Sequence, residues 1–367
     1  MKEWIISVLR KPVLRLTERF SSNPDRARIF TALSDLLSRI LNGDDDKGLV
    51  VPFDIETGKF IIFSDQHKGG KNGADDFAIC EPAYVEALEY YHQNGYHLIS
   101  LGDSEELWEN TLTAVRKSHK PAFEKEKAFI PRNAFIKVFG NHDLHWANDP
   151  LAPFQLKEIY HYDVPIYEGV VLQTKIKDKR IRIFCTHGHQ GDKVSDGNWF
   201  SKFFIAKIWA PLQSFLKINP NTPAYDASLK TLHNTIMYEW SVQQPGLILI
   251  TGHTHQPVFE SLTHIERLYR QLLFARLQGN IAEQEKMQKE ITRRRFQFAD
   301  VSDDYLSLQP CYFNSGCCCF DNGAITGIEI SSGIIRLIEW KSIDGVMQRI
   351  MLQETTLAEL YEALIKK

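Results

Sequence analysis

The sequence predicts an α/β (α+β) protein, built as a four-layer αββα sandwich of two mixed sheets with helical insertions. Five short apolar runs lack polar alternation, which is typical of strands buried on both faces. A helical pattern separates the first two runs, as in folds where strands and helices alternate. Two later runs, 324–331 and 333–340, have the pattern of antiparallel strands and indicate a second sheet.

The five runs are rich in Ile, Val and Phe and read KFIIFS, HLISLG, FIKVFG, IRIFCT and LILITG. The helix between the first two begins near Pro82 and ends before Gly95, because proline favours the first turn of a helix and glycine the position after its end. By the same signals, we expect an N-terminal amphipathic helix with Asn23 as its N-cap, Pro24 in its first position and its end before Gly43.

The order of these patterns predicts how the chain is divided. Two stretches interrupt the rhythm of strands, one rich in aromatic and aliphatic residues and one with helical spacing on both sides of a Gly–Asn turn. We expect an N-terminal helical extension at 1–50, a core at 51–345 with a helical cap at 195–245 and a helical hairpin at 260–298, and a C-terminal helical tail at 346–367.

Composition limits the class of protein. The 367 residues are 43% hydrophobic and 24% charged, as in ordinary soluble proteins. The net charge of -3 lacks the basic excess of nucleic-acid binders, so nucleic acid is not an expected partner. No apolar run approaches the roughly 20 residues of a membrane span. We expect a cytoplasmic protein that touches the inner membrane surface through the amphipathic stretch 199–217.

Cysteine usage favours a reducing compartment. Three of the six cysteines are consecutive, Cys317, Cys318 and Cys319, a spacing that does not suit a disulfide framework. The prediction for this triplet is a buried strand. A soft-metal site is the alternative, although no paired CxxC spacing supports it.

Polar residues follow each of the five runs. Because the carboxyl ends of neighbouring strands meet at one edge of a sheet, sequence order suggests a single site there. The clusters are Asp65 with His67, Asp103, Asn141 with His142 and Asp143, His187 with His189, and His253 with His255.

These residue types suit a pair of metal ions. Two divalent ions about 3.5–4 Å apart can hold a phosphoryl group and activate a water between them. Mn²⁺, Fe²⁺ and Zn²⁺ accept mixed carboxylate and imidazole ligands, whereas Mg²⁺ prefers oxygen and water. We expect two divalent ions, Mn²⁺ first and Fe²⁺ or Zn²⁺ as alternatives, with Asp103 bridging them through its two oxygens.

The segments SDQH, GD, GNHD, THGH and GHTH resemble the five signature motifs of the calcineurin-like metallophosphoesterases, over a region from Gly58 to Pro257. The resemblance implies two metal sites bridged by Asp103. One would be formed by Asp65, His67 and His255, and the other by Asn141, His187 and His253.

The same resemblance implies roles for further residues. His142 matches the family's residue that contacts the substrate phosphate or assists the leaving group, and Asp143 would orient its ring. In THGH the family's ligand directly follows the strand, which favours His187 and leaves His189 to a supporting or substrate-binding role. Lys68 and Trp108 are further candidates for substrate contacts.

The predicted reaction is hydrolysis of a phosphodiester, pyrophosphate or phosphomonoester bond by attack of a metal-bridging hydroxide. The expected substrate is a phosphorylated small molecule or a lipid-linked nucleotide. The insertion before GHTH and the segment GDSEELWEN are similar to the UDP-2,3-diacylglucosamine pyrophosphatase branch of the family. That branch commonly carries arginine at the position of His142, which puts the lipid-nucleotide substrate in question.

Three alternatives stay open. One is a repair-type nuclease that uses the arginines at 293–295 to grip phosphate, although the net charge does not favour it. Another is a Ser/Thr-phosphatase-like enzyme, although GNHD replaces that group's GNHE. The last is a non-catalytic scaffold whose 260–298 hairpin binds partners; the same hairpin would also allow a homodimer.

Overall fold

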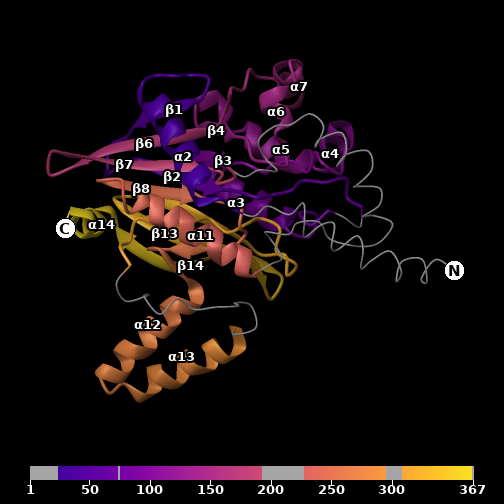
Figure 1. Ribbon diagram of the computed structural model, residues 1–367. Coiled ribbons are helices and arrows are strands. Elements are labelled where there is room, and N and C mark those ends of the chain that lie inside the picture. The colour runs from indigo at the N-terminus through magenta and orange to yellow at the C-terminus, as the bar shows by residue number, and fades with distance from the viewer. Residues whose placement is uncertain (1–23, 73–74, 192–226, 295–307, 366–367) are drawn as a thin grey trace, which may run out of the picture.

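The computed structural model describes residues 24–72, 75–191, 227–294 and 308–365, which form four layers (Figure 1). Two sheets of seven strands each pack face to face. Helices α2 and α11 cover the outer face of one sheet, and α3 and α5 cover the outer face of the other. The predicted αββα sandwich is therefore confirmed.

The first sheet has the strand order β1-β6-β7-β8-β11-β9-β10 and mixes parallel and antiparallel pairs. Its strands are β1 (Gly48–Pro52), β6 (Gly169–Ile176), β7 (Lys179–Thr186), β8 (Leu247–Thr251), β9 (Val258–Phe259), β10 (Leu262–Thr263) and β11 (Tyr312–Asn314).

The second sheet has the order β14-β13-β12-β2-β3-β4-β5. Its strands are β2 (Lys59–Phe63), β3 (His97–Leu101), β4 (Phe135–Val138), β5 (Ile166–Tyr167), β12 (Ile325–Ser331), β13 (Ile334–Ile343) and β14 (Val346–Thr356). Strands β2 to β5 run parallel, so the loops at their carboxyl ends lie along one edge.

The helices connect and cover these strands. They are α2 (Arg26–Leu41), α3 (Glu81–Gln93), α4 (Leu112–Ser118), α5 (Lys120–Lys127), the 3₁₀ helix η1 (Ile130–Arg132), α6 (His145–Asn148), α7 (Ala152–Tyr160), α11 (Ala227–Ser241), α12 (His264–Leu277), α13 (Ile281–Arg294) and α14 (Leu357–Ile365).

Strand β2 shows why the apolar runs lack polar alternation. Phe60 and Ile62 face the core between the sheets, where Leu172 of β6 also lies. Ile61 and Phe63 face the opposite way and pack with α3. A strand with a packed layer on both sides needs apolar residues at consecutive positions.

The two late strands form a different pairing from the one predicted. Residues 324–331 and 333–340 do pair antiparallel, as β12 and β13. However, β12 also pairs with β2, so they extend the sheet of the first three runs and do not start a second sheet. This pairing places Ile328 and Ile330 in the core between the sheets, and the second sheet is built around β7 and β8.

Both ends of the chain depart from the predicted pattern. Helix α2 begins at Arg26, because the carboxylate of Asp25 accepts the Ala27 and Arg28 amides at 3.0 and 3.2 Å and so forms the N-cap. The predicted N-cap, Asn23, lies outside the described residues. The helical tail predicted for 346–367 is wrong in its first part, since β14 pairs along the whole of β13 and leaves only α14 helical.

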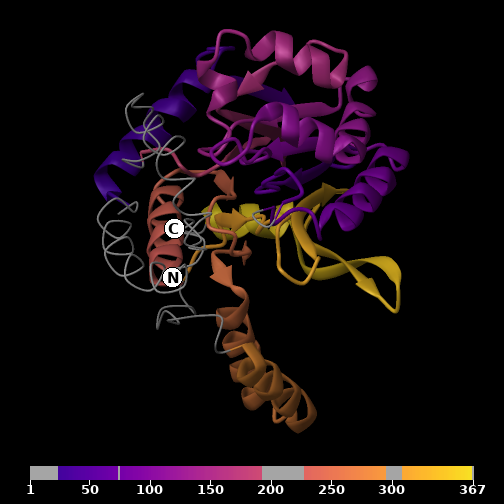
Figure 2. The same cartoon turned by 90° about the vertical axis from the view of Figure 1, so that its right-hand side faces the viewer.

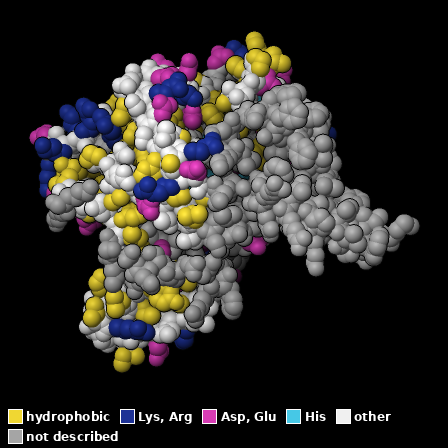
Figure 3. All heavy atoms as spheres, in the orientation of Figure 1, with side chains coloured by type: hydrophobic (Ala, Val, Ile, Leu, Met, Phe, Trp, Pro, Cys, Tyr) yellow, Lys and Arg dark blue, Asp and Glu magenta, His cyan; other side chains and the backbone are white. Residues whose placement is uncertain are grey.

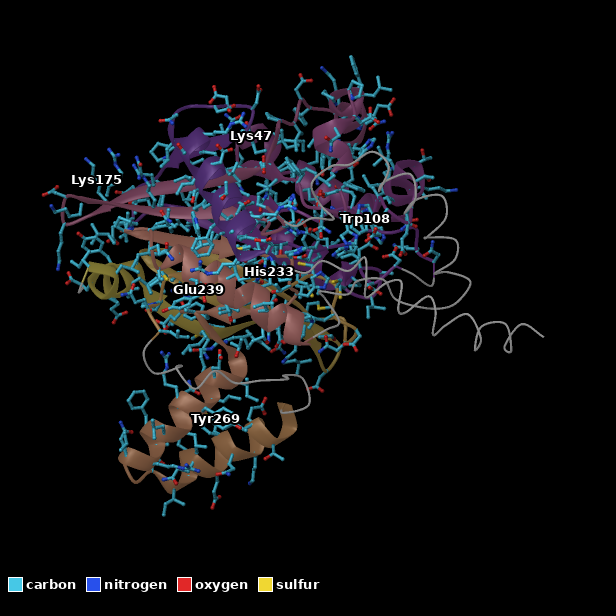
Figure 4. All side chains as sticks on the ribbon, in the orientation of Figure 1. Lys47, Trp108, Lys175, His233, Glu239 and Tyr269 are labelled. Atoms are coloured by element: carbon cyan, nitrogen blue, oxygen red, sulfur yellow. The ribbon has the colours of Figure 1, made fainter. Side chains whose placement is uncertain are left out.

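Residues 264–294 form a helical hairpin that extends away from the sandwich (Figure 2). Its helices meet along a small apolar seam of Leu268, Leu272, Met287 and Ile291, with Tyr269 packed beside it (Figure 4). Because this seam is separate from the main cores, the hairpin is a satellite of the fold. Most of the predicted cap at 195–245, including 199–217, lies outside the described residues, and α11 is its described end.

Candidate metal centre

The polar clusters meet where the carboxyl ends of strands from both sheets come together. Asp65, Asp103 and Asn141 follow β2, β3 and β4 in one sheet, whereas His187 and His253 follow β7 and β8 in the other. The single-sheet edge predicted from sequence order is therefore wrong. The site lies across the seam between two sheets, which is how five strand ends can surround one point.

Backbone hydrogen bonds hold the first two loops together beyond the ends of their strands. The amides of Asp65, His67 and Lys68 donate to the carbonyls of Gly102, Asp103 and Ser104 at 3.0, 2.9 and 3.1 Å. The pairing of β2 with β3 thus continues into the loops. It fixes the first two motifs relative to each other before any side chain is considered.

Five of the predicted ligands have left-handed backbone conformations, namely Asp65, His67, Asp103, His253 and His255, with φ between 50° and 68°. Such conformations cost of order 1–3 kcal/mol each for residues with a side chain, and they cluster at functional sites. Here they turn the chain sharply after each strand. Unfavourable conformations at five candidate ligands indicate a functional role for these loops.

Two glycines allow the loops to approach closely. A Cβ at Gly102, where φ is +87°, would lie 2.6 Å from the His187 ring. A Cβ at Gly140 would overlap the Asp103 carboxylate. Both positions therefore require glycine for the ligand side chains to keep their places.

One group of donors, which we call cluster 1, contains Asp65, His67 and His255. The Nε2 atoms of His67 and His255 are 3.1 Å apart, and His255 Nε2 lies 3.2 Å from Asp65 Oδ1. Separations near 3 Å are expected between neighbouring ligands that each lie about 2.1 Å from one ion. The three donors thus converge on one point.

A second group, cluster 2, contains Asn141, His187 and His253. His187 and His253 join Asp103 in a set of ligand atoms that all lie within 4.8 Å of one another. Asp103 Oδ2 is 3.1 Å from His187 Nε2 and 3.8 Å from His67 Nε2, so one oxygen faces both clusters. This is the geometry that a bridging carboxylate needs.

Buried donor atoms without hydrogen-bond partners indicate, independently of any family resemblance, that these residues fit metal ions. Asn141 Oδ1 and His253 Nε2 are buried, and neither makes a hydrogen bond among the described residues. Buried polar atoms without partners are costly and rare in folded proteins. The convergence of His187 and His253 on Asp103 is explained if a divalent cation completes the site, and imidazole with carboxylate and amide oxygen suits Mn²⁺, Fe²⁺ or Zn²⁺.

Outer hydrogen bonds set the imidazole tautomers. His67 Nδ1 donates to Glu106 Oε2 at 3.0 Å, and His187 Nδ1 donates to the Leu101 carbonyl at 2.9 Å. Each bond leaves Nε2 as the atom that faces the site, as is usual for histidines that bind metals. Glu106 was missed in the sequence, and only its place three residues after Asp103 could have drawn notice.

The predicted role of Asp143 is wrong, because Glu106 and not Asp143 holds the His142 ring. The ring of His142 is held by Glu106, whose Oε2 accepts from His142 Nδ1 at 2.6 Å, and it stacks on Trp108 at 4.0 Å between ring centroids. Asp143 accepts instead from the amides of Ser104 and Gly140, at 2.8 and 2.6 Å. It therefore holds two loops together and does not orient the His142 ring.

Lys68 is not a substrate contact, since its side chain is fully buried beneath the site. Its ammonium donates to Glu126 at 2.6 Å and to Ser104 at 2.9 Å, and it lies 3.3 Å from Glu105. Lys137 adds a second cation 3.0 Å from Glu105. This buried ion network supports the loops that carry Asp65, His67 and Asp103.

Two histidines lie against cluster 2 without a place in it. The His189 ring is 5.4 Å from that of His187, and the His233 ring of α11 is 5.1 Å from that of His253 (Figure 4). Burial and the charge of His187 lower their pKa values, to about 3 for His189 and about 4 for His233. Both rings are therefore neutral at pH 7. His233 belongs to no motif that could have identified it in the sequence.

The predicted strand at the cysteine triplet is wrong, because Cys317, Cys318 and Cys319 form a loop after β11. The first two are buried, and Cys319 is partly exposed. Cys319 Sγ lies 3.6 Å from His255 Nδ1, at the edge of cluster 1. The triplet thus belongs to the surroundings of the site.

Fold and site together define a layered α/β protein whose buried histidines and aspartates could hold metal ions. Residues 14–257 match the family model described as calcineurin-like phosphoesterase, and the chain belongs to that family. Members of this family are generally metal-dependent phosphoesterases. The resemblance drawn from the five motifs is confirmed.

Solved structures of two proteins named vacuolar protein sorting 29 are also similar. The one from Cryptosporidium parvum has 12% identity and a TM-score of 0.31, and the match covers 82% of this chain and 98% of that one. A single mutant from Entamoeba histolytica has 14% identity and a TM-score of 0.28, with 80% and 99% covered. The search of curated proteins found no match.

Within the described ranges 24–72, 75–191, 227–294 and 308–365, no helix is both long and apolar enough to cross a bilayer.

Replacing Lys68 with methionine is expected to lower the free energy of unfolding by about 3–5 kcal/mol, because Glu105 and Glu126 lose a buried cation. The matched control is Lys157→Met, which breaks an exposed pair with Asp163 at 3.0 Å and should cost less than about 1 kcal/mol. Urea unfolding measures both. Equal losses would contradict the structural role given to Lys68.

Metal binding is expected to release protons at neutral pH. Burial disfavours the charged form of both rings, but Glu106 and Asp103 outweigh it at His67 and raise its pKa to about 10, and Asp103 raises that of His187 to about 9. In the metal-free protein both rings thus carry a proton that the metal must displace from Nε2. Calorimetry of Mn²⁺ binding in buffers of different ionisation enthalpy measures this release.

The same values predict how the metal-free fold responds to pH. A raised pKa adds stability below the unfolded value of about 6.5, and that stability is lost as pH rises through about 9 to 10. The melting temperature of the metal-free protein should therefore fall from pH 7 to 10, with a smaller fall in the Mn²⁺-loaded protein. Equal falls in the melting temperature of the metal-free and the Mn²⁺-loaded protein would contradict the assignment of His67 and His187 as metal ligands.

Proposed function

We propose that the protein is a binuclear metal-dependent phosphoesterase that hydrolyses a phosphodiester, pyrophosphate or phosphomonoester bond. The observation that carries this proposal is the pair of donor clusters that share Asp103. Two clusters joined by one carboxylate suit two ions held a few ångströms apart, which is the arrangement of two-metal hydrolases. Family membership supports the same reaction class.

The bound ions would supply a nucleophilic water and neutralise charge on the phosphoryl oxygens. We propose Mn²⁺ as the physiological ion, with Fe²⁺ or Zn²⁺ as alternatives, because the donors mix imidazole nitrogen with carboxylate and amide oxygen. Cluster 1 would hold one ion through Asp65, His67 and His255. Cluster 2 would hold the other through Asn141, His187 and His253, with Asp103 shared between them.

The chain's own catalytic group is proposed to be His142. Its Nδ1 is bound to Glu106 and its face is stacked on Trp108, so only Nε2 remains to face a substrate. From there it would donate a hydrogen bond to a phosphoryl oxygen or a proton to the leaving oxygen. The His142 amide also donates to Asp103 Oδ1 at 2.7 Å, which ties this residue to the bridging carboxylate.

A lipid-linked nucleotide is the proposed substrate class. The motif resemblance around Asp103 and the insertion between β7 and β8, at 187–246, support it. Contact with the inner membrane surface through 199–217 would bring such a substrate to the site, and a cytoplasmic location follows from the same proposal. A water-soluble phosphorylated molecule is the competing substrate.

The hairpin is proposed to mediate self-association. At its tip, Phe274, Leu277 and Ile281 are 53%, 74% and 69% exposed. Hydrophobic side chains are visible on this part of the surface in Figure 3. An apolar tip on a projecting hairpin suits a second copy of the chain, in which equivalent tips would cover each other.

Asp103→Asn should reduce hydrolysis of a generic aryl phosphodiester by at least about 100-fold, since supporting residues alone commonly contribute 10–100-fold. The reason is that Asp103 Oδ2 faces both clusters, and a neutral amide oxygen lacks the negative charge that holds two cations there. The control is Asp163→Asn, whose side chain is 85% exposed and pairs with Lys157, a residue of neither cluster. An unchanged rate in correctly folded Asp103→Asn would refute the proposed function.

The substrate class is tested by incubating the Mn²⁺-loaded protein with UDP-2,3-diacylglucosamine and with aryl phosphomonoesters and phosphodiesters. We expect release of UMP from the lipid-linked nucleotide, followed by chromatography. Cleavage of the aryl esters without UMP release would remove the lipid-nucleotide proposal and leave the phosphoesterase proposal intact.

A further inference from the structure

The loop of the cysteine triplet touches cluster 1 in two places. The Cys318 amide donates to the Asp65 carbonyl at 3.1 Å, and Cys319 Sγ lies 3.6 Å from His255 Nδ1. Cys319 also belongs, with His67 and His255, to a set of candidate ligand atoms within 4.8 Å of one another. The loop thus contacts two donors of the same cluster.

The position of this loop is fixed by the sheets. The Ser315 amide donates to the Thr251 carbonyl at 2.9 Å, next to the strand end that carries His253 and His255. The Thr326 amide donates to the Cys317 carbonyl at 3.0 Å. Because both flanks are bonded to strands, the thiol of Cys319 is held at a defined place beside His255.

The orientation of the His255 ring decides what the sulfur can do. His255 Nε2 faces Asp65 at 3.2 Å and His67 Nε2 at 3.1 Å, so Nε2 is the atom available to an ion. Nδ1 is then the nitrogen that carries the proton, and it points toward Cys319. The sulfur is placed to accept the Nδ1 hydrogen.

The outer partners of the candidate ligands differ in strength. His67 donates to the Glu106 carboxylate and His187 to the Leu101 carbonyl. These are the usual outer partners of metal-binding histidines, and they fix the ring and raise its basicity. A thiol is a weak acceptor. His255 is therefore a ligand whose orientation depends on a weak and chemically distinctive contact.

We propose that Cys319 is a positioning residue that sets the metal affinity of cluster 1 through the His255 ring. The inference rests on the proposed function, because it requires an ion at cluster 1. It predicts that affinity at this cluster, and not at cluster 2, follows the strength of the acceptor at position 319. A stronger acceptor would tighten cluster 1, and removal of the acceptor would loosen it.

Three full-length variants test this dependence. Cys319→Ala removes the acceptor, and Cys319→Asp gives His255 the same kind of partner that His67 has. Cys318→Ala is the matched control, because the Cys318 thiol is fully buried one residue away and lies near the Thr326 carbonyl at 4.0 Å, not near His255. Thermal unfolding establishes that each variant folds.

The measurement is the number of Mn²⁺ ions retained per chain, by native mass spectrometry, as the concentration of a chelator increases. Cys319→Ala should lose one of its two ions at roughly 10–100-fold lower effective affinity than the unmodified protein. Cys319→Asp should retain that ion at least as well as the unmodified protein. Cys318→Ala should match the unmodified protein even if its melting temperature falls.

The outcomes separate this inference from the function on which it rests. If the unmodified protein binds two ions and hydrolyses phosphoesters, but Cys319→Ala keeps both ions with unchanged affinity, the inference alone is overturned. An equal loss in Cys319→Ala and Cys318→Ala would also overturn it, because that points to general packing. If the unmodified protein binds no ions, both the proposed function and this inference fail.

Discussion

The structure depends on placing acidic side chains close together in a region that excludes water. Asp65, Asp103 and Glu106 are all buried, and such charges are tolerated only when cations or hydrogen bonds compensate them. Histidines from both sheets provide this compensation. Burial lowers the pKa of His67 less than Glu106 and Asp103 raise it, so the metal-free ring remains charged. A cation at this point can take over the same compensation.

A second set of buried charges consists of carboxylates paired with lysines, and these pairs keep the loops in place. Glu105 and Glu126 are matched by Lys68 and Lys137, and all four are buried below the candidate site. The buried acidic residues therefore fall into two groups, those paired with lysines and those surrounded by histidines. Glu105 and Glu126, which have lysine partners, support the fold. Among the described residues, the ion-pair partners of Asp103 are His67 and His187, which leaves its charge available to an ion. Removing one lysine partner is therefore expected to damage the fold before it damages the chemistry.

The two-sheet architecture explains how the site can be both strained and rigid. Left-handed residues such as Asp65 and His255 are unfavourable, yet each follows a strand buried in a packed sheet. The His253 amide donates to the Asp65 carboxylate at 3.0 Å, which joins a loop of one sheet to a loop of the other. The cost of the loops is thus offset by the packing of the strands that carry them.

The sequence by itself determined the five strands that precede the motifs and the candidate donors, because strand propensity and motifs such as GNHD and GHTH are local properties of the chain. The tertiary structure decided the rest. It paired β12 with β2 and buried Lys68 beneath the site. It also placed Glu106, and not Asp143, where it accepts the hydrogen bond of the His142 ring. It also brought Cys319 to His255. The reason is that a side chain's partner depends on which strands pair. Cys319 and His255 are 64 positions apart in the chain and become neighbours only through that pairing.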